Sequence, residues 1–380
     1  MVEYPLDFFL AANSTQGFVS RFDQLGDHQQ GWRSIIIKGV PGCGKSTLMK
    51  QAAQAMAGCG EAVEQIHCSS DPDSLDGVIL EDLCVSVADG TAPHVLEPRY
   101  PGAFERVLNL FDALDMEELY RLREEIIDLF DQNHTLYERA YRFLSAAGSL
   151  QSDSSRLGTE CLNLVKLNKT ALRMARQEFA PSRARLSNLQ NENTGKEKIR
   201  FLSAVSKDGV VFYEQTVKTL CSRVYLLIDE VGCPGKYFLS ALRSLALSAK
   251  QQVISCYCPL RPFDKLEHLL IPSAGVGFIT SNSFHKPELP IEGVINCRRF
   301  LDQDLLRDRK QKLTFNRRAT RELLTEGQRI MGEAKAVHDQ LERCYHKAVD
   351  FSVVDSKLEE LLNMLFFFRE EREKKKQLQY

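Results

Sequence analysis

The sequence predicts an α/β fold with two tandem parallel-sheet domains, each followed by a helical hairpin arm. Three observations lead to this prediction. A run of β-branched residues at 33–38 precedes a glycine-rich loop and a helical pattern from Leu48 to Ala57. The sequence also matches itself when it is shifted by 191 residues. Finally, long apolar stripes at helical spacing follow each of the two matching regions.

Composition places the chain among globular proteins. Its 380 residues, 43% of them hydrophobic and 26% charged, are enough for two domains with separate cores. The 49 Lys and Arg residues nearly balance the 51 Asp and Glu residues, and the formal net charge is −2. Such a balance gives no basic footprint for nucleic acid or for an anionic membrane, so we expect neither as a partner.

The N-terminal segment and the cysteines indicate a compartment. Residues 1–14 lack the basic start of a signal peptide, and no apolar run approaches the length of a membrane span. The eleven cysteines are scattered and odd in number, which fits a reducing environment. These features predict a cytoplasmic protein.

The glycine-rich loop has the pattern GxxxxGK[ST] between a strand and a helix, which is the context of a phosphate-binding loop, or P-loop. Glycines let the backbone curl until successive N–H groups point into one concavity, where the phosphates of ATP lie. The helix that starts at the lysine adds the positive end of its dipole. The residues expected to hold the nucleotide are Gly39, Val40, Pro41, Gly42, Cys43, Gly44, Lys45, Ser46 and Thr47.

Roles within this site follow from side-chain chemistry. We expect Lys45 to reach the β- and γ-phosphates as a catalytic group, and the Ser46 hydroxyl to bind Mg²⁺. The partner acid should end a neighbouring hydrophobic strand, and Asp89 after the apolar run 83–88 is the candidate, both as a catalytic and as a metal-site residue. An ordinary Asp-Gly turn is the alternative for this residue. Gly90 follows it, so the hydrolytic Glu that many ATP-driven motors place here is missing.

Residues 64–76, a strand that ends in a polar and acidic loop, lie between the P-loop helix and Asp89, and they begin the His-containing segment 67–94. Open α/β sheets bind ligands at the carboxyl ends of their strands, so this segment is placed for a second substrate. Asp71 and Asp73 are candidate acid/base or Mg²⁺ groups, and His67 and His94 are candidate γ-phosphate sensors. Helix capping and ordinary loop contacts are the alternatives for each of them.

The 191-residue shift places the P-loop on a second, altered copy. Gly44 and Lys45 fall on Gly235 and Lys236, and His94 falls on His285. Flanking apolar positions agree as well, which predicts an internal duplication.

The second copy lacks the groups that the chemistry needs. Glu230 replaces the first glycine of the motif, Tyr237 replaces the metal-binding serine, and Thr280 stands in place of Asp89. Asp229 and Glu230 would also bring two carboxylates to a loop meant for phosphates, and like charges at ~4 Å repel by several kcal/mol near a protein surface. We therefore expect an inactive pseudo-site.

A rival interpretation uses the same residues differently. The hydrophobic run 223–228 followed by Asp229 and Glu230 also resembles the strand-plus-Asp-Glu signature of an ATPase. One domain would then run from Lys45 to Glu230 with a long helical insertion. The internal repeat explains more of the sequence than this single-domain interpretation does, so we prefer the repeat.

Four segments follow from the duplication. They are a P-loop nucleotide-binding domain at 1–110, a helical arm with a linker at 111–195, a degenerate P-loop-like domain at 196–298 and a C-terminal helical arm at 299–380. Each domain is expected to hold a five-stranded parallel sheet of the Rossmann-like type flanked by helices. The polar stretch 180–196 is the expected linker.

Several motifs resemble a bacterial family of duplicated P-loop NTPases. They are FFLAANSTQGFVSRFD, GVPGCGKSTLMK, IHCSSDPDSLDGVI, DGTAPH and EPRYPGA, which together cover most of residues 7–110. Members of that family are usually described as ATPases or as nucleotide-kinase-like proteins, without an established substrate. The resemblance implies ATP binding on Gly44, Lys45, Ser46 and Thr47. In that family the second half of the chain commonly carries a GK[ST] loop of its own. The second half of this sequence lacks that loop, which puts a second nucleotide site in doubt.

Two classes of function remain open. The first is an ATP-hydrolysing switch, an ATPase whose helical arms move when nucleotide binds or leaves and contact a protein partner. The second is a small-molecule or nucleotide kinase that holds its acceptor with the segment 67–94. ATP and Mg²⁺ are the expected cofactors of both.

Overall fold

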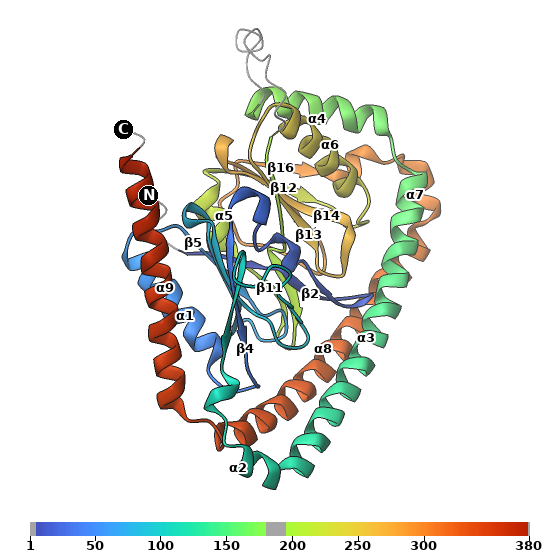
Figure 1. The fold of residues 1–380 in the computed structure, drawn as a ribbon. Helices are drawn as coiled ribbons and strands as arrows, with labels where there is room; N and C mark the ends of the chain where they lie inside the picture. Colours follow the sequence, from blue (N-terminus) through green and yellow to red (C-terminus); the bar gives the residue numbers. More distant parts are fainter. Residues whose placement is uncertain (1–4, 180–194, 379–380) are drawn as a thin grey trace. The chain divides into compact units, whose positions relative to one another are not determined.

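The computed structural model describes residues 5–179 and 195–378 (Figure 1). The predicted linker at 180–196 therefore lies almost wholly outside the described residues. Within the described ranges, every helix is too short or too polar to cross a bilayer.

The chain forms two compact units that each combine distant segments. Unit 1 comprises Met1–Ala11, Ser20–Glu138 and Ile330–Tyr380, and unit 2 comprises Ala12–Val19 and Arg139–Arg329. Two long helices carry the chain from one unit into the other, α3 (Arg123–Glu160) and α8 (Lys310–His346).

The main sheet of unit 1 has six strands in the order β1-β5-β6-β7-β4-β8. The central strand β4 is parallel to both of its neighbours, β7 and β8, and β1 is parallel to β5. The β-branched residues of β4 are buried, as its sequence predicts. The strands are β1 (Leu6–Phe9), β4 (Arg33–Lys38), β5 (Val63–His67), β6 (Leu75–Leu80), β7 (Val85–Asp89) and β8 (Glu105–Asn109).

The prediction of a wholly parallel five-stranded sheet is wrong. Strand β6 runs antiparallel to both β5 and β7. The reason is the length of its connections, the loop 68–74 and the short turn at Glu81–Leu83. A parallel neighbour needs a crossover of a dozen or more residues, so β5, β6 and β7 can only form a meander.

The main sheet of unit 2 has the order β16-β12-β15-β14-β13-β9. Each strand corresponds to one in unit 1, and the directions agree, since β14 is antiparallel to β13 and β15 while β12 is parallel to β15 and β16. The strands are β9 (Glu197–Arg200), β12 (Arg223–Ile228), β13 (Val253–Cys258), β14 (Arg261–Ile271), β15 (Val276–Ser281) and β16 (Gly293–Asn296).

Two short two-stranded sheets accompany the main sheets. One is formed by β2 (Ala11–Ser14) and β3 (Gly17–Ser20), the other by β10 (Ser203–Ser206) and β11 (Gly209–Phe212). The remaining helices are α1 (Lys45–Gly58), α2 (Met116–Arg121), α4 (Leu164–Glu178), α5 (Glu214–Leu220), α6 (Pro234–Ser248), α7 (Gln303–Asp308) and α9 (Phe351–Gln377).

The helices after each sheet do not form the self-contained hairpins that the apolar stripes predicted. In unit 1, α9 lies beside α1 and buries Leu361 and Leu365 in the core of the first sheet (Figure 1). In unit 2, α4 packs on α6 and buries Leu167 and Ala171 in the core of the second sheet. An apolar stripe shows that a helix face is buried, but it does not specify the surface that buries it.

Candidate functional site

The P-loop lies where the sequence predicted it, between β4 and α1 of unit 1. Gly44 is the N-cap residue of α1 with φ +92°, and Gly42 has φ +71°. Both values lie in the left-handed region that only glycine adopts without cost, so these two positions set the curl of the loop.

The Lys45 ammonium folds back over its own loop. Its Nζ donates hydrogen bonds to the carbonyl oxygens of Gly39 (3.2 Å) and Val40 (2.8 Å). The same Nζ lies 3.6 Å from Oδ2 of Asp89. The ammonium thus joins the loop to the end of the neighbouring strand.

Asp89 is placed by the pairing of β7 with β4, in which it stands opposite Ile37. Its Oδ1 accepts hydrogen bonds from the backbone N–H (2.8 Å) and the hydroxyl (2.5 Å) of Thr91. One carboxylate oxygen of Asp89 therefore holds the turn after the strand, as the turn interpretation expects, and the other faces Lys45.

The hydroxyl-bearing residues of the motif differ in their surroundings. Ser46 Oγ accepts a hydrogen bond from the backbone N–H of Leu75 (2.9 Å), at the start of β6, whereas Thr47 is exposed on α1. Cys43 is buried against the core beneath the loop, and this burial raises the pKa of its thiol. Cys43 is therefore a packing residue of the loop and not a nucleophile.

The C-terminal segment of unit 1 covers the P-loop, which the sequence did not reveal. A Cβ placed on Gly42 would lie 2.9 Å from the carbonyl oxygen of Glu342 on α8. A Cβ on Gly44 would lie 3.4 Å from Val354 on α9. Glycine at position 42 is thus required twice, by its backbone angle and by the close approach of α8.

The two candidate sensor histidines are held by carboxylates. His67 lies 2.9 Å from Asp7 through Nε2 and 2.7 Å from the carbonyl oxygen of Pro72 through Nδ1. His94 is buried, with Nε2 2.9 Å from Oδ2 of Asp76. Burial alone would lower the pKa of His94, but the Asp76 carboxylate raises it above its usual value. Neither contact involves the P-loop.

The side chains of Asp71 and Asp73 have different surroundings. Asp73 is exposed, whereas Asp71 accepts a hydrogen bond from the Ser74 hydroxyl (3.2 Å) and lies 3.3 Å from Nζ of Lys335 on α8. Burial opposes the charge of Lys335, but Asp339 and Asp71 together raise its pKa. Sequence reasoning missed Lys335 because 264 positions separate it from Asp71 and no motif marks it.

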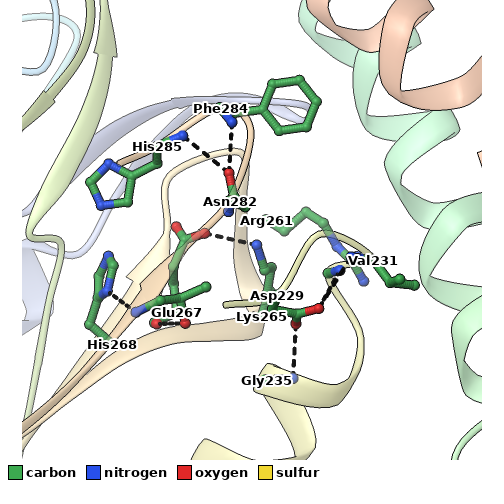
Figure 2. Close-up of polar contacts among 12 residues, drawn as sticks. Asp229, Val231, Gly235, Arg261, Lys265, Glu267, His268, Asn282, Phe284 and His285 are labelled. Atoms are coloured by element: carbon green, nitrogen blue, oxygen red, sulfur yellow. Dashed lines mark hydrogen bonds and ion pairs between the residues drawn. The ribbon is translucent and has the colours of Figure 1, made fainter. Parts of the chain in front are cut away.

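The altered loop of unit 2 is filled by its own side chain (Figure 2). The carboxylate of Asp229, which is 3% exposed, accepts hydrogen bonds from the backbone N–H groups of Val231 (3.2 Å), Gly232 (2.9 Å) and Gly235 (2.8 Å). Burial raises the pKa of Asp229, although Lys265 and these N–H groups oppose the rise. The donors that a P-loop offers to phosphate are thus taken by a carboxylate.

The neighbouring Glu230 points elsewhere. It is 43% exposed, and its carboxylate lies 3.7 Å from Arg317 on α8. Lys236, the counterpart of Lys45, is 3.3 Å from Asp264. Neither side chain contacts the backbone donors of the altered loop in the contacts that the structure records.

One protein family matches the chain. Residues 35–90 match the viral superfamily 1 RNA helicase core domain. This segment runs from β4 to just past β7 and includes the whole P-loop and Asp89. No curated protein and no solved structure matches the chain.

The match defines a class. It indicates a P-loop NTPase-type domain in the N-terminal half, and thereby a nucleotide-binding function. Since the match covers a minor part of the 380 residues, it names the type of domain and not the family of the whole chain.

Proposed function

We propose that the protein is an ATP-hydrolysing switch with one nucleotide site, formed in unit 1 by Gly39–Thr47 and Asp89. The observation that carries the proposal is the meeting of Lys45 and Asp89 at the carboxyl ends of two adjacent parallel strands. This is where open α/β sheets bind their ligands.

The residues present fit Mg²⁺ and a triphosphate. The ion prefers oxygen ligands, and the loop supplies the Ser46 hydroxyl while β7 supplies the Asp89 carboxylate at its end. The left-handed glycines at 42 and 44 shape a backbone cradle for phosphate. When bound, Mg²⁺ would neutralise charge on the phosphates.

Lys45 is the group that changes partners in this mechanism. Its ammonium contacts two loop carbonyls and the Asp89 carboxylate. A γ-phosphate carries more negative charge than a carbonyl, so the ammonium would move to it and stabilise charge that develops during phosphoryl transfer. Gly90 stands where many ATP-driven motors carry the hydrolytic Glu, so we expect slow hydrolysis; this one feature favours the kinase alternative discussed below.

Helix α8 is the element that would respond. Its residue Glu342 lies against Gly42, so the loop cannot change shape without displacing the helix or sliding along it. The first part of the same helix belongs to unit 2, so α8 is the segment through which we propose that a change at the loop reaches the second half of the chain.

We further propose that the altered loop of unit 2 is a pseudo-site. A triphosphate would have to displace the Asp229 carboxylate from its three N–H donors. This supports one triphosphate per chain. The shared strand order of the two sheets supports an internal duplication.

A kinase is the second candidate, and the pair Asp71–Lys335 favours it. The Asp71 carboxylate, within the segment 67–94, lies 3.3 Å from the Lys335 ammonium. Together the two charged groups would orient a polar acceptor near the phosphates. The helicase match raises RNA as a third partner, but the net charge of −2 gives no electrostatic footprint for it.

One experiment separates the three functions. ATP labelled on its γ-phosphate is incubated with the protein alone, with a panel of small-molecule acceptors, and with single-stranded RNA. We expect free phosphate to be released at the same rate in all three incubations. Label on an acceptor would establish the kinase, and strong stimulation by RNA would establish a nucleic-acid-dependent enzyme.

A second experiment addresses the switch itself. Hydrogen exchange is followed in the peptide 338–346 of α8 with and without Mg²⁺-ATP. We expect nucleotide to change protection there, because Glu342 contacts Gly42. Unchanged protection in protein saturated with ATP would refute the switch and leave the ATPase.

A further inference from the structure

Unit 2 contains a cavity of about 660 Å³ beside its altered loop. The cavity lies at the carboxyl ends of three parallel strands: Ile228 ends β12, Asn282 follows β15 and Asn296 ends β16. Ligands of open α/β sheets bind at this edge, and the volume lies in the range of ~300–1,000 Å³ that small-molecule sites occupy.

Cationic side chains dominate the charged lining. The acids are Asp229 and Glu230, and the cations are Arg261, Lys265, Arg298, Arg307, Lys310 and Arg317. These cations come from β14, from the turn at Cys297–Phe300, from α7 and from α8. Because four separate elements converge, the charge is not the solvated face of a single helix.

Three of the cations are paired with carboxylates outside the cavity lining. Lys265 is buried and donates a hydrogen bond to Glu267 (2.8 Å; Figure 2). Arg261 donates one to Asp264 (3.0 Å), and Arg307 lies 3.3 Å from Asp304. Arg261 and Lys265 are therefore held by partners on their own strand, β14.

The guanidinium groups of Arg298 and Arg317 are held less firmly. Arg298 donates to the neutral side-chain amide of Gln303 (2.8 Å), which leaves its charge uncompensated by that partner. Arg317 faces Glu230 at 3.7 Å, and both side chains are more than 40% exposed. Exposed pairs of this kind are weak, so a ligand anion can replace Glu230 at little cost.

The remaining lining fixes the class of ligand. The backbone donors of the loop are taken by Asp229, so a phosphate here must be held by side chains, and guanidinium groups bind phosphate in a bidentate manner. Leu301, Leu306 and Phe284 also line the cavity and can contact the apolar part of an organic molecule. The side-chain oxygens of Asn282 and Asn296 accept backbone hydrogen bonds, so their NH₂ groups are what they can offer to its hydroxyl groups.

We propose that this cavity binds a phosphorylated small molecule, with the phosphate on Arg298 and Arg317. The site is separate from the P-loop of unit 1 and does not depend on the proposed ATPase. It gives the second half a ligand of its own in place of the lost triphosphate site.

Pyrophosphate is the probe for this site. It is titrated calorimetrically into the full-length Lys45→Ala chain without Mg²⁺, so that the P-loop does not contribute. We expect about one site per chain. The double variant Arg298→Gln/Arg317→Gln in the same background should bind at least tenfold more weakly, since two charge-assisted contacts to phosphate are lost.

The matched control is Arg156→Gln. Arg156 also lies in unit 2, on α3, where it pairs with Asp153 and does not line the cavity. Its removal should leave pyrophosphate affinity unchanged. Absence of binding to the Lys45→Ala chain, or equal affinity in the double variant and the control, would overturn the proposal.

The same proteins keep the two proposals apart. With Lys45 intact, the Arg298→Gln/Arg317→Gln chain should bind Mg²⁺-ATP normally. Pyrophosphate binding by the wild-type chain together with a failure of that same chain to bind Mg²⁺-ATP would refute the proposed ATPase and leave the cavity site standing.

Discussion

Replacing Asp229 by alanine should open the altered loop of unit 2. Its buried carboxylate accepts three backbone N–H bonds, at 3.2, 2.9 and 2.8 Å. Bonds to charged groups are worth about 1.5–3 kcal/mol each. Relief from burying the carboxylate, the burial that raises its pKa, offsets part of that sum.

We therefore expect a net loss of about 3 kcal/mol in the local stability of the loop, which corresponds to roughly a hundredfold faster opening. Hydrogen exchange of a peptide covering 229–238 measures this directly, because Val231, Gly232 and Gly235 supply the protected amides. The distal turns of α6 should exchange as in the wild type.

The adjacent Glu230→Gln is the matched control. Its side chain is half-exposed and bonded to none of the loop donors, so exchange of the same peptide should change less than about threefold. If Asp229→Ala left the exchange of these amides unchanged, the carboxylate would not be what fills the loop, and the physical argument for a pseudo-site would fail.

Three further predictions concern chemistry and pH. Asp89→Asn should keep part of the ATP affinity but slow Mg²⁺-dependent phosphate release at least tenfold, since its carboxylate faces Lys45; a wild-type rate would place the metal-site acid elsewhere. Glu230→Gln should change single-turnover hydrolysis less than about threefold, whereas loss of a general base would cost ~10²–10⁴-fold and trap uncleaved ATP. Burial alone would raise the pKa of Glu267, but Lys265 and the nearby histidines lower it from 4.5 to about 2. The contribution of Glu267 to the free energy of unfolding is therefore fully present above pH 4.5 and is lost as the pH falls towards 2, which urea unfolding across this range measures. Glu267→Gln should lack this pH dependence, and an unchanged acid profile in that variant would contradict the assignment.

Local sequence patterns predicted the strand and the helix that flank the P-loop. The strand 33–38 and the helix start at Lys45 lie where hydrophobic periodicity and the glycine spacing predict them, because both depend on neighbouring residues. The direction of β6 was missed, although its short connections are visible in the sequence. Loop length there should have outweighed the expectation of a parallel sheet.

Long-range contacts could not be predicted. Glu342 meets Gly42 and Lys335 meets Asp71 from a helix that begins in the other half of the chain, and no motif marks either residue. For Asp229, the sequence predicted the charge correctly but not the contacts of the side chain. The sequence revealed a misplaced carboxylate and predicted repulsion of phosphate, but its hydrogen bonds to the loop depend on a side-chain direction that only the structure gives.

The central claim is that the P-loop of unit 1, and not its counterpart in unit 2, holds the nucleotide. Lys45 and Lys236 occupy matching positions, but Lys45 faces its loop and Asp89 while Lys236 lies beside Asp264. The most direct measurement is titration calorimetry of Mg²⁺-ATP into Lys45→Ala and Lys236→Ala chains in parallel. We predict that Lys45→Ala loses at least tenfold in affinity and that Lys236→Ala binds one ATP as tightly as the wild type. Wild-type affinity in Lys45→Ala, or a loss in Lys236→Ala, would contradict the account.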